Sequence, residues 1–119
     1  MAVVLLAEDD VALQEIYATW LEDIGDVTVH TAATGGEAAA RVDRSVDVAV
    51  LDRRMPGDEV ARRVRSTHPD CDIVVVSAFG PDERGPAGDC DRYLTKPIRR
   101  EQLVAAVERG IGGLVRPVR

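Results

Sequence analysis

Lysine is almost absent from this sequence, and the basic residues form no dense run anywhere along it. Of the 15 basic residues, 14 are arginine and only Lys96 is lysine, and the net charge at pH 7 is −6. A chain of this charge offers no concentrated positive surface to a phosphate backbone or to an anionic membrane. We therefore expect no direct binding to nucleic acid and no membrane association.

Long hydrophobic runs are missing as well. The N-terminal apolar stretch stops at Ala7 with no cationic residues before it, whereas a membrane span needs ~20 apolar residues. This pattern argues against a signal peptide and a transmembrane helix. Cysteine is also scarce: Cys71 and Cys90 fit no metal-binding spacing, and we expect buried or half-buried thiols in a reducing compartment. A cytoplasmic location is expected.

What the sequence does have is the composition of one globular domain. It has 119 residues, 45% of them hydrophobic, which is enough for a single core. We expect the domain to occupy residues 1–111 and residues 112–119 to be a C-terminal tail or the start of a linker.

Short apolar runs alternate with amphipathic segments along the chain. Residues 3–7, 46–51 and 72–78 are rich in β-branched side chains, the pattern of central strands that are covered on both faces. Residues 27–31 and 92–95 predict two weaker strands. The alternation favours an α/β open parallel sheet, whose ligand site lies beyond the carboxyl ends of its strands.

Four other segments predict helices. The first carries an apolar stripe at helical spacing and ends before Gly25, a typical helix stop. Its stripe consists of Leu13, Ile16, Tyr17, Trp20, Leu21 and Ile24. The other three helices are predicted at residues 35–44, 58–67 and 100–111.

Polar residues follow the predicted strands directly. They are Glu8, Asp9 and Asp10 after the first strand, Asp52 after the third, Ser77 at the end of the fourth and Lys96 after the fifth. Carboxylates that converge at one sheet edge repel one another unless a cation joins them, and oxygen ligands suit Mg²⁺. We expect Asp10 to cap the first helix and the other acids to hold a divalent ion for a phosphoryl group.

Each of these residue types has a role in phosphoryl transfer. A carboxylate can attack phosphorus to give an aspartyl phosphate, and Asp52 is the candidate nucleophile. Glu8 and Asp9 would hold Mg²⁺ against the phosphoryl oxygens, and Ser77 would donate a hydrogen bond to one of them. Lys96 supplies a compact point charge, whereas the wide planar fork of arginine would crowd a small pocket that also holds a metal.

Four segments carry a resemblance to a known family. "LLAEDD", "VLDRRMPG", "VVVSA" and "YLTKP" resemble the hallmark segments of receiver domains of two-component response regulators, in the family's order across nearly the whole chain. The resemblance implies a flavodoxin-like, doubly wound, five-stranded parallel sheet with strand order 2-1-3-4-5. It also implies that Asp52 is the phosphoacceptor and that Glu8 and Asp9 are the metal-binding acid pair.

The same resemblance implies a switch. Ser77 corresponds to the family's switch hydroxyl, and Tyr93 stands where the family has its rotameric aromatic residue. Lys96 corresponds to the phosphate-sensing lysine, Pro97 follows a bond that is commonly cis, and the backbone carbonyl of Arg54 is a further metal ligand. The phosphoryl group would come from a histidine kinase or phosphotransfer protein and be lost by hydrolysis, so we expect a signalling domain and not an enzyme that turns over a metabolite.

One segment departs from the family pattern. Residues 80–89 are rich in glycine and proline where receivers carry a fourth helix, so that helix is predicted to be short or disrupted. The family usually contacts a downstream effector or a homodimer partner through the face formed by its fourth helix, fifth strand and fifth helix. We therefore expect this output face to be altered.

Two other functions fit parts of the pattern. A phosphohydrolase or mutase with an aspartyl nucleophile usually has a second acid two residues after it. Position 54 is arginine, which argues against this class of enzyme. A receiver-like protein-interaction module that works without phosphorylation is the main alternative.

Overall fold

Five strands of the described chain form one sheet. The computed structural model describes residues 2–43, 45–54, 58–78 and 90–114. The strands are β1 (Ala2–Ala7), β2 (Val27–Ala32), β3 (Val48–Asp52), β4 (Asp72–Ser77) and β5 (Arg92–Thr95). They are all parallel and lie in the order β2-β1-β3-β4-β5, which confirms the predicted 2-1-3-4-5 topology.

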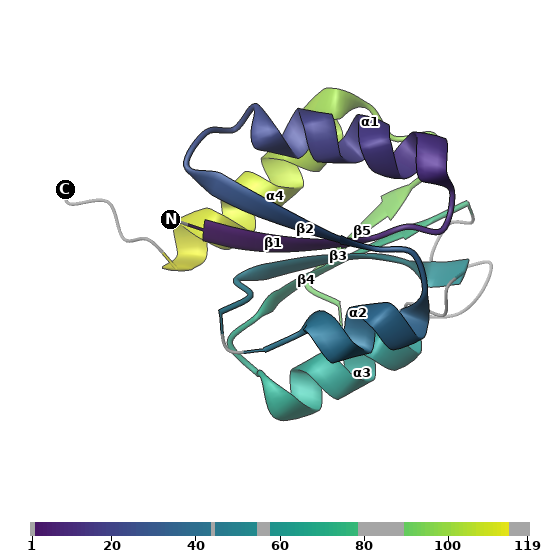
Figure 1. The fold of residues 1–119 in the computed structure, drawn as a ribbon. Helices are drawn as coiled ribbons and strands as arrows, with labels where there is room; N and C mark the ends of the chain where they lie inside the picture. The colour runs from purple at the N-terminus through teal and green to yellow at the C-terminus, as the bar shows by residue number, and fades with distance from the viewer. Residues whose placement is uncertain (1, 44, 55–57, 79–89, 115–119) are drawn as a thin grey trace, which may run out of the picture.

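Helices cover both faces of this sheet (Figure 1). Helices α1 (Val11–Glu22) and α4 (Arg100–Leu114) lie on one face, and α2 (Gly35–Arg41) and α3 (Asp58–Thr67) lie on the other. Cover on both faces explains why the central strands are almost continuously apolar. The arrangement is the flavodoxin-like, doubly wound fold expected from the sequence.

The core consists of two clusters of buried side chains, one on each face of the sheet. On one face Leu51 of β3 packs in the same cluster as Val64 of α3. On the other face its neighbour Val50 packs with Leu21 of α1 and Leu103 of α4. Successive residues of a strand point to opposite faces, so one short apolar strand contributes to both clusters.

Several predicted boundaries are confirmed. Helix α3 and strand β5 have the predicted bounds. Helix α1 begins after Asp10, whose Oδ1 accepts a hydrogen bond from the backbone N of Leu13 at 3.1 Å, as expected of an N-cap. Strand β3 ends on Asp52 itself. The candidate nucleophile is therefore the last residue of a strand and not the first residue of a loop.

Two predictions about helices are wrong. Helix α2 ends at Arg41 and not at residue 44, because Val42 has extended backbone (φ −73°, ψ 122°). The Oδ1 atom of Asp43 then accepts a hydrogen bond from the backbone N of Ser45 at 2.8 Å, which closes a turn in place of a further helical turn. In α1, Ile16 was expected on the apolar stripe but is 44% exposed, so the buried stripe is narrower than predicted.

The sequence also predicts helices in residues 80–89 and 100–111. The short or disrupted helix predicted in residues 80–89 lies outside the described residues. Helix α4 continues past Ile111 to Leu114. In the part of the chain that the structure describes, no helix combines the length and the apolar character that crossing a bilayer requires.

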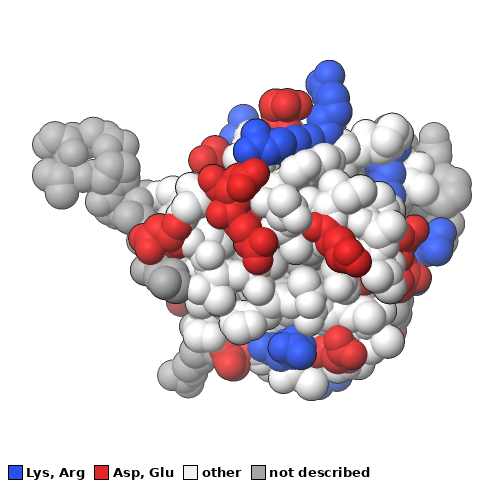
Figure 2. Space-filling model, turned by 45° about the horizontal axis from the view of Figure 1, so that its top comes forward, with Lys and Arg blue, Asp and Glu red and all other residues white. Residues whose placement is uncertain are grey.

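Carboxylates gather on the surface around α1 (Figure 2). The chain has no lysine or arginine before Arg41, so the charged residues of α1 and of the loops on either side of it are all acidic. Arg100 of α4 lies 3.4 Å from Asp23, and both side chains are about half exposed. An exposed pair of this kind contributes little to stability.

Candidate functional site

The predicted site residues meet at the carboxyl edge of the sheet. Glu8 follows β1, Asp52 ends the neighbouring β3, Ser77 ends β4 and Lys96 follows β5. Glu8, Asp52 and Ser77 are polar yet only 2%, 3% and 4% exposed. Burying polar groups is unfavourable unless they find partners, so the contacts of these side chains define what the site can do.

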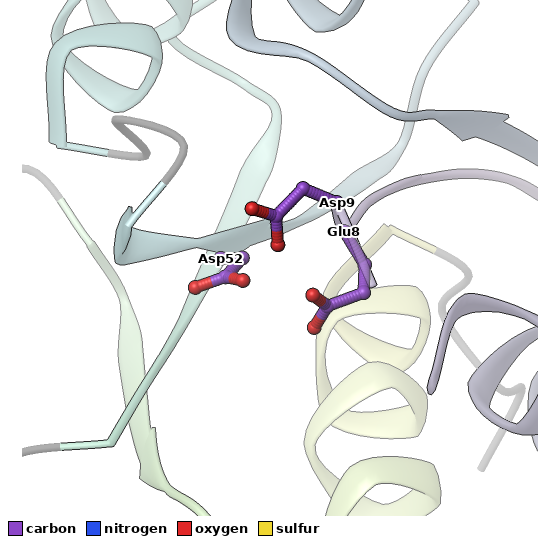
Figure 3. Close-up of side chains that lie close together, drawn as sticks. All are labelled: Glu8, Asp9 and Asp52. Atoms are coloured by element: carbon purple, nitrogen blue, oxygen red, sulfur yellow. The ribbon is translucent and has the colours of Figure 1, made fainter. Parts of the chain in front are cut away.

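Three carboxylates face one another at this edge (Figure 3). Glu8, Asp9 and Asp52 each offer an oxygen, and these oxygens lie within 4.8 Å of one another. The first two residues come from the loop after β1 and the third from the end of β3. An oxygen-only set of this kind fits Mg²⁺, a hard cation that binds through one or two carboxylates and keeps several waters. The donor chemistry therefore agrees with the predicted metal.

Lys96 lies against two of these acids. Its Nζ is 3.0 Å from Oε1 of Glu8 and 3.4 Å from Oδ2 of Asp52. Burial by itself lowers the pKa of Lys96, but the hydrogen bond to Glu8 and the charge of Asp52 outweigh it and raise the pKa above its ordinary value. The ammonium therefore remains charged and opposes part of the negative charge of the site.

The loop that carries Lys96 is anchored to the neighbouring strand. The backbone N of Lys96 donates a hydrogen bond to the carbonyl oxygen of Ser77 at 2.7 Å. The bond between Lys96 and Pro97 is cis, as the resemblance implied. The ends of β4 and β5 are thus held together directly beside the carboxylates.

Glu8 is the most perturbed acid of the site. Burial raises the pKa of its carboxyl to about 7, and the hydrogen bond from the backbone N of Asp10 to its Oε2, at 3.1 Å, opposes the shift. Among the smaller contributions to this value, the neighbouring Asp52 raises the pKa and Lys96 lowers it. One ammonium is therefore not enough to keep Glu8 readily ionised near neutral pH.

Arg54 contacts two of the acids in different ways. Its backbone N donates a hydrogen bond to Oδ1 of Asp52 at 3.1 Å. Its guanidinium Nη2 lies 3.8 Å from Oδ2 of Asp9, and the side chain is 76% exposed. The backbone contact orients the Asp52 carboxylate, whereas the exposed ion pair is weak. The predicted role of its carbonyl oxygen as a metal ligand remains a prediction.

Sequence reasoning missed Gln14. The Nε2 atom of this α1 residue donates hydrogen bonds to the carbonyl oxygens of Glu8, at 3.0 Å, and Ala32, at 3.2 Å. It therefore ties the loop that carries Glu8 to the end of β2. Its position one turn after the Asp10 cap is the one signal that could have identified it.

Tyr93 lies two strands away from Asp52 but contacts the residue that follows Asp52 in the sequence. The Nη1 atom of Arg53 donates a hydrogen bond to the phenol oxygen of Tyr93 at 3.0 Å. The resemblance implied that Tyr93 is the rotameric aromatic residue of the family, and Arg53 is known from the sequence only as the residue after Asp52. The sequence did not predict that the two side chains meet. The roles of Tyr93 and Ser77 as a switch remain predictions.

The chain is similar to known proteins in sequence and structure. The model of the response regulator receiver domain matches residues 4–108. A putative transcriptional regulator of Haloferax volcanii is 38% identical over 109 residues, which are 89% of this chain and 19% of that protein. Response regulator MprA of Mycobacterium leprae is 37% identical over 111 residues, 87% of this chain and 48% of that protein. The chain therefore spans less than half of either relative.

A solved structure agrees with these matches. Response regulator protein TrrA of Thermotoga maritima, in complex with Mg²⁺–BeF, has a TM-score of 0.81 and 25% identity, with 92% of this chain and 99% of that chain covered. The matched residues include every acid at the carboxyl edge as well as Ser77 and Lys96. This chain belongs to the receiver domain family of response regulators.

Proposed function

We propose that this receiver domain accepts a phosphoryl group on Asp52 in the presence of Mg²⁺ and that the modification switches its conformation. The observation that carries the proposal is the buried Asp52 carboxylate, which lies 3.4 Å from the Nζ of Lys96 and beside two further acids. Together the four side chains have an excess of negative charge that a divalent cation offsets. TrrA, which has a similar fold, forms a complex with Mg²⁺–BeF, and this supports phosphoryl-group binding as the role of the site in this chain.

Asp52 is suited to act as the nucleophile. The backbone N of Arg54 holds Oδ1, and Oδ2 faces Lys96. A carboxylate oxygen attacks the phosphorus atom of the donor, and the new O–P bond forms as the bond from phosphorus to the donor's leaving atom breaks. Lys96 then offsets charge on a phosphoryl oxygen, and the hydroxyl of Ser77 donates a hydrogen bond to another.

A metal completes this charge balance. Glu8, Asp9, Asp52 and the backbone carbonyl of Arg54 are the groups that would hold Mg²⁺, and bound Mg²⁺ neutralises charge that develops on the phosphoryl oxygens. Glu8 must lose its proton to take part, and Lys96 favours that ionised form. The loop after β1, fixed by Gln14, keeps the acids in place.

The phosphoryl donor is a histidine kinase or a phosphotransfer protein in the cytoplasm, and the domain itself catalyses both the transfer and the later hydrolysis. Ser77 and Tyr93 pass the change to a surface that a downstream effector or a second copy reads. The relatives in which the domain is a minor part of the length include proteins named as transcriptional regulators. The net charge of −6 disfavours direct binding of this domain to DNA.

Calorimetric titration with beryllofluoride, a mimic of the phosphoryl group, tests the proposal. We expect saturable binding that needs Mg²⁺ and that is lost in Asp52→Asn. Asp10→Asn is the matched control, because it removes the adjacent charge but keeps a good N-cap. If the folded parent protein shows no Mg²⁺-dependent binding, the domain is an interaction module that works without phosphorylation and the proposal is wrong.

A further inference from the structure

Arg53 connects the end of β3, where the phosphoacceptor lies, to the edge strand β5. It directly follows Asp52 at the end of β3, whereas Tyr93 lies on β5. Strand β4 lies between β3 and β5. The side chain of Arg53 nevertheless reaches across, because its Nη1 atom donates a hydrogen bond to the phenol oxygen of Tyr93 at 3.0 Å.

The contact involves the tyrosine ring as well as its hydroxyl. The guanidinium carbon of Arg53 lies 5.8 Å from the centroid of the Tyr93 ring, within cation–π range. Both side chains are half-buried, and Tyr93 packs against the core cluster on the face of α2 and α3. One guanidinium thus contacts Tyr93 in two ways, and both contacts depend on the position of the ring.

We propose that Arg53 is a positioning residue that couples the orientation of Tyr93 to the charge on Asp52. The inference rests on the proposed function, because it requires a phosphoryl group on Asp52. In the unmodified protein Arg53 holds the ring as described above. When Asp52 is phosphorylated, the guanidinium leaves Tyr93 for the phosphoryl oxygens, and the ring loses its contacts with Arg53.

The strength of the competing partners gives this exchange its direction. The phenol oxygen of Tyr93 is a neutral acceptor, whereas a phosphoryl group carries about two negative charges and several acceptor oxygens. The hydrogen bond to the phenol has one charged partner, whereas a bond to a phosphoryl oxygen joins two opposite charges, and the planar fork of arginine matches two phosphate oxygens at once. Lys96 already opposes the negative charge of Glu8 and Asp52. The charge that a phosphoryl group adds is therefore left for a second cation to neutralise, and Arg53 is next in sequence to Asp52.

Fluorine NMR of protein labelled with 3-fluorotyrosine can follow the ring directly. The chain has two tyrosines, so the spectrum has two side-chain resonances, and Tyr17→Phe assigns them. Spectra are recorded with and without beryllofluoride and Mg²⁺, and the fluorine signal of the bound mimic reports its occupancy in each variant. The Tyr93 resonance reports the environment of the ring, which a change in stability alone does not move.

In the parent protein we expect the Tyr93 resonance to shift when the mimic binds. In Arg53→Gln the resonance should already be displaced before addition, and the further shift should be less than half that of the parent. Arg53→Lys keeps the charge but not the fork, and should restore part of the shift. Arg62→Gln removes an exposed arginine of α3 and should behave as the parent.

Two results would overturn the inference, and they are distinguishable. If the mimic binds but Arg53→Gln matches the parent in both states, Arg53 does not position Tyr93, although the proposed function stands. If the mimic fails to bind the parent protein, the proposed function fails and the coupling fails with it.

Discussion

The two ends of the parallel sheet use acidic residues in opposite ways. At the amino end, Asp47 accepts a hydrogen bond from the backbone N of Val3 at 2.9 Å. Asp91 accepts hydrogen bonds from the backbone N of Ile73 at 2.8 Å and from Nη2 of Arg65 at 2.7 Å. At the carboxyl end, three carboxylates face one another instead, and two of them, Glu8 and Asp52, share one ammonium.

The number of donors that the chain itself supplies explains this difference. Asp47 has a backbone donor, Asp91 has a backbone and an arginine donor, and Asp72 has Arg92 as its ion-pair partner. Those carboxylates need no ligand and stabilise the starts of the strands. At the carboxyl end, the pKa of Glu8, raised to about 7 chiefly by burial, shows that the chain's own donors are insufficient. The same residue type is therefore structural at one end and free to bind a cation at the other.

The sharpest way to break this comparison is to remove one acid from the carboxyl end. Asp9→Asn should weaken Mg²⁺ binding by more than about 100-fold, because even groups that only orient a metal ligand change affinity by about 10–100-fold when removed. The stability of the metal-free protein should not fall. Calorimetric Mg²⁺ titration measures the affinity, with Asp10→Asn as the control. Binding within a few-fold of the parent would show that Asp9 is not a ligand.

The reverse result is expected at the amino end. Asp91→Ala removes the acceptor of the backbone N of Ile73 and of Arg65, and should lower the free energy of unfolding by about 1–3 kcal/mol. Its Mg²⁺ affinity should equal that of the parent. Urea denaturation measures the first effect, and the exposed Asp70→Ala is the control. An unchanged stability would contradict a structural role for this acid.

The pH dependence of metal binding sharpens the role of Glu8. Without metal, the native protein keeps a proton on Glu8 that the unfolded chain releases near pH 4.5, so this group's contribution to stability falls as pH rises toward about 7. Mg²⁺ needs the ionised carboxylate of Glu8. The Mg²⁺ affinity should therefore rise as the pH increases through about 7, by at most about tenfold per pH unit. Glu8→Gln should bind Mg²⁺ more weakly and lose this dependence. A parent affinity that is constant across neutral pH would exclude Glu8 as a ligand.

The smallest effect is expected for an acid at neither end. Asp23 pairs with Arg100 at 3.4 Å on the surface, where solvent screens the pair. Asp23→Asn should change the free energy of unfolding by less than about 0.5 kcal/mol and leave Mg²⁺ affinity unchanged. A larger loss in urea denaturation would mean that exposed acids matter as much as those at the strand ends.

Much of the fold could be predicted from the sequence because buried parallel strands have a local signal. Apolar runs of β-branched residues marked the central strands, and the spacing of Leu21 and its neighbours marked α1. The end of α2 was not predictable from its alanine-rich composition, since the turn depends on hydrogen bonds from the backbone N and the hydroxyl of Ser45 to Asp43. The exposure of Ile16 depends on how α1 is rotated against the sheet, which periodicity defines only to within a residue.

The candidate site was predictable to the extent that strand ends meet at one edge. This rule predicts from the sequence alone that Asp52, Glu8 and Lys96 lie close together. Contacts that cross a strand were not predictable, because they depend on the direction of long side chains. The hydrogen bond from Arg53 to Tyr93 is of this kind, and the anchoring of the Glu8 loop by Gln14 likewise depends on the direction of a long side chain.

The central claim is that the acids at the carboxyl end gather a cation so that Asp52 can be phosphorylated. Intact mass spectrometry after incubation with a small phosphodonor such as acetyl phosphate tests it most directly. We predict the addition of one phosphoryl group to the parent and to Asp10→Asn, none after Mg²⁺ is removed with EDTA, and none in Asp52→Asn. An unmodified parent, or a phosphoryl group that is still added to Asp52→Asn, would contradict the account.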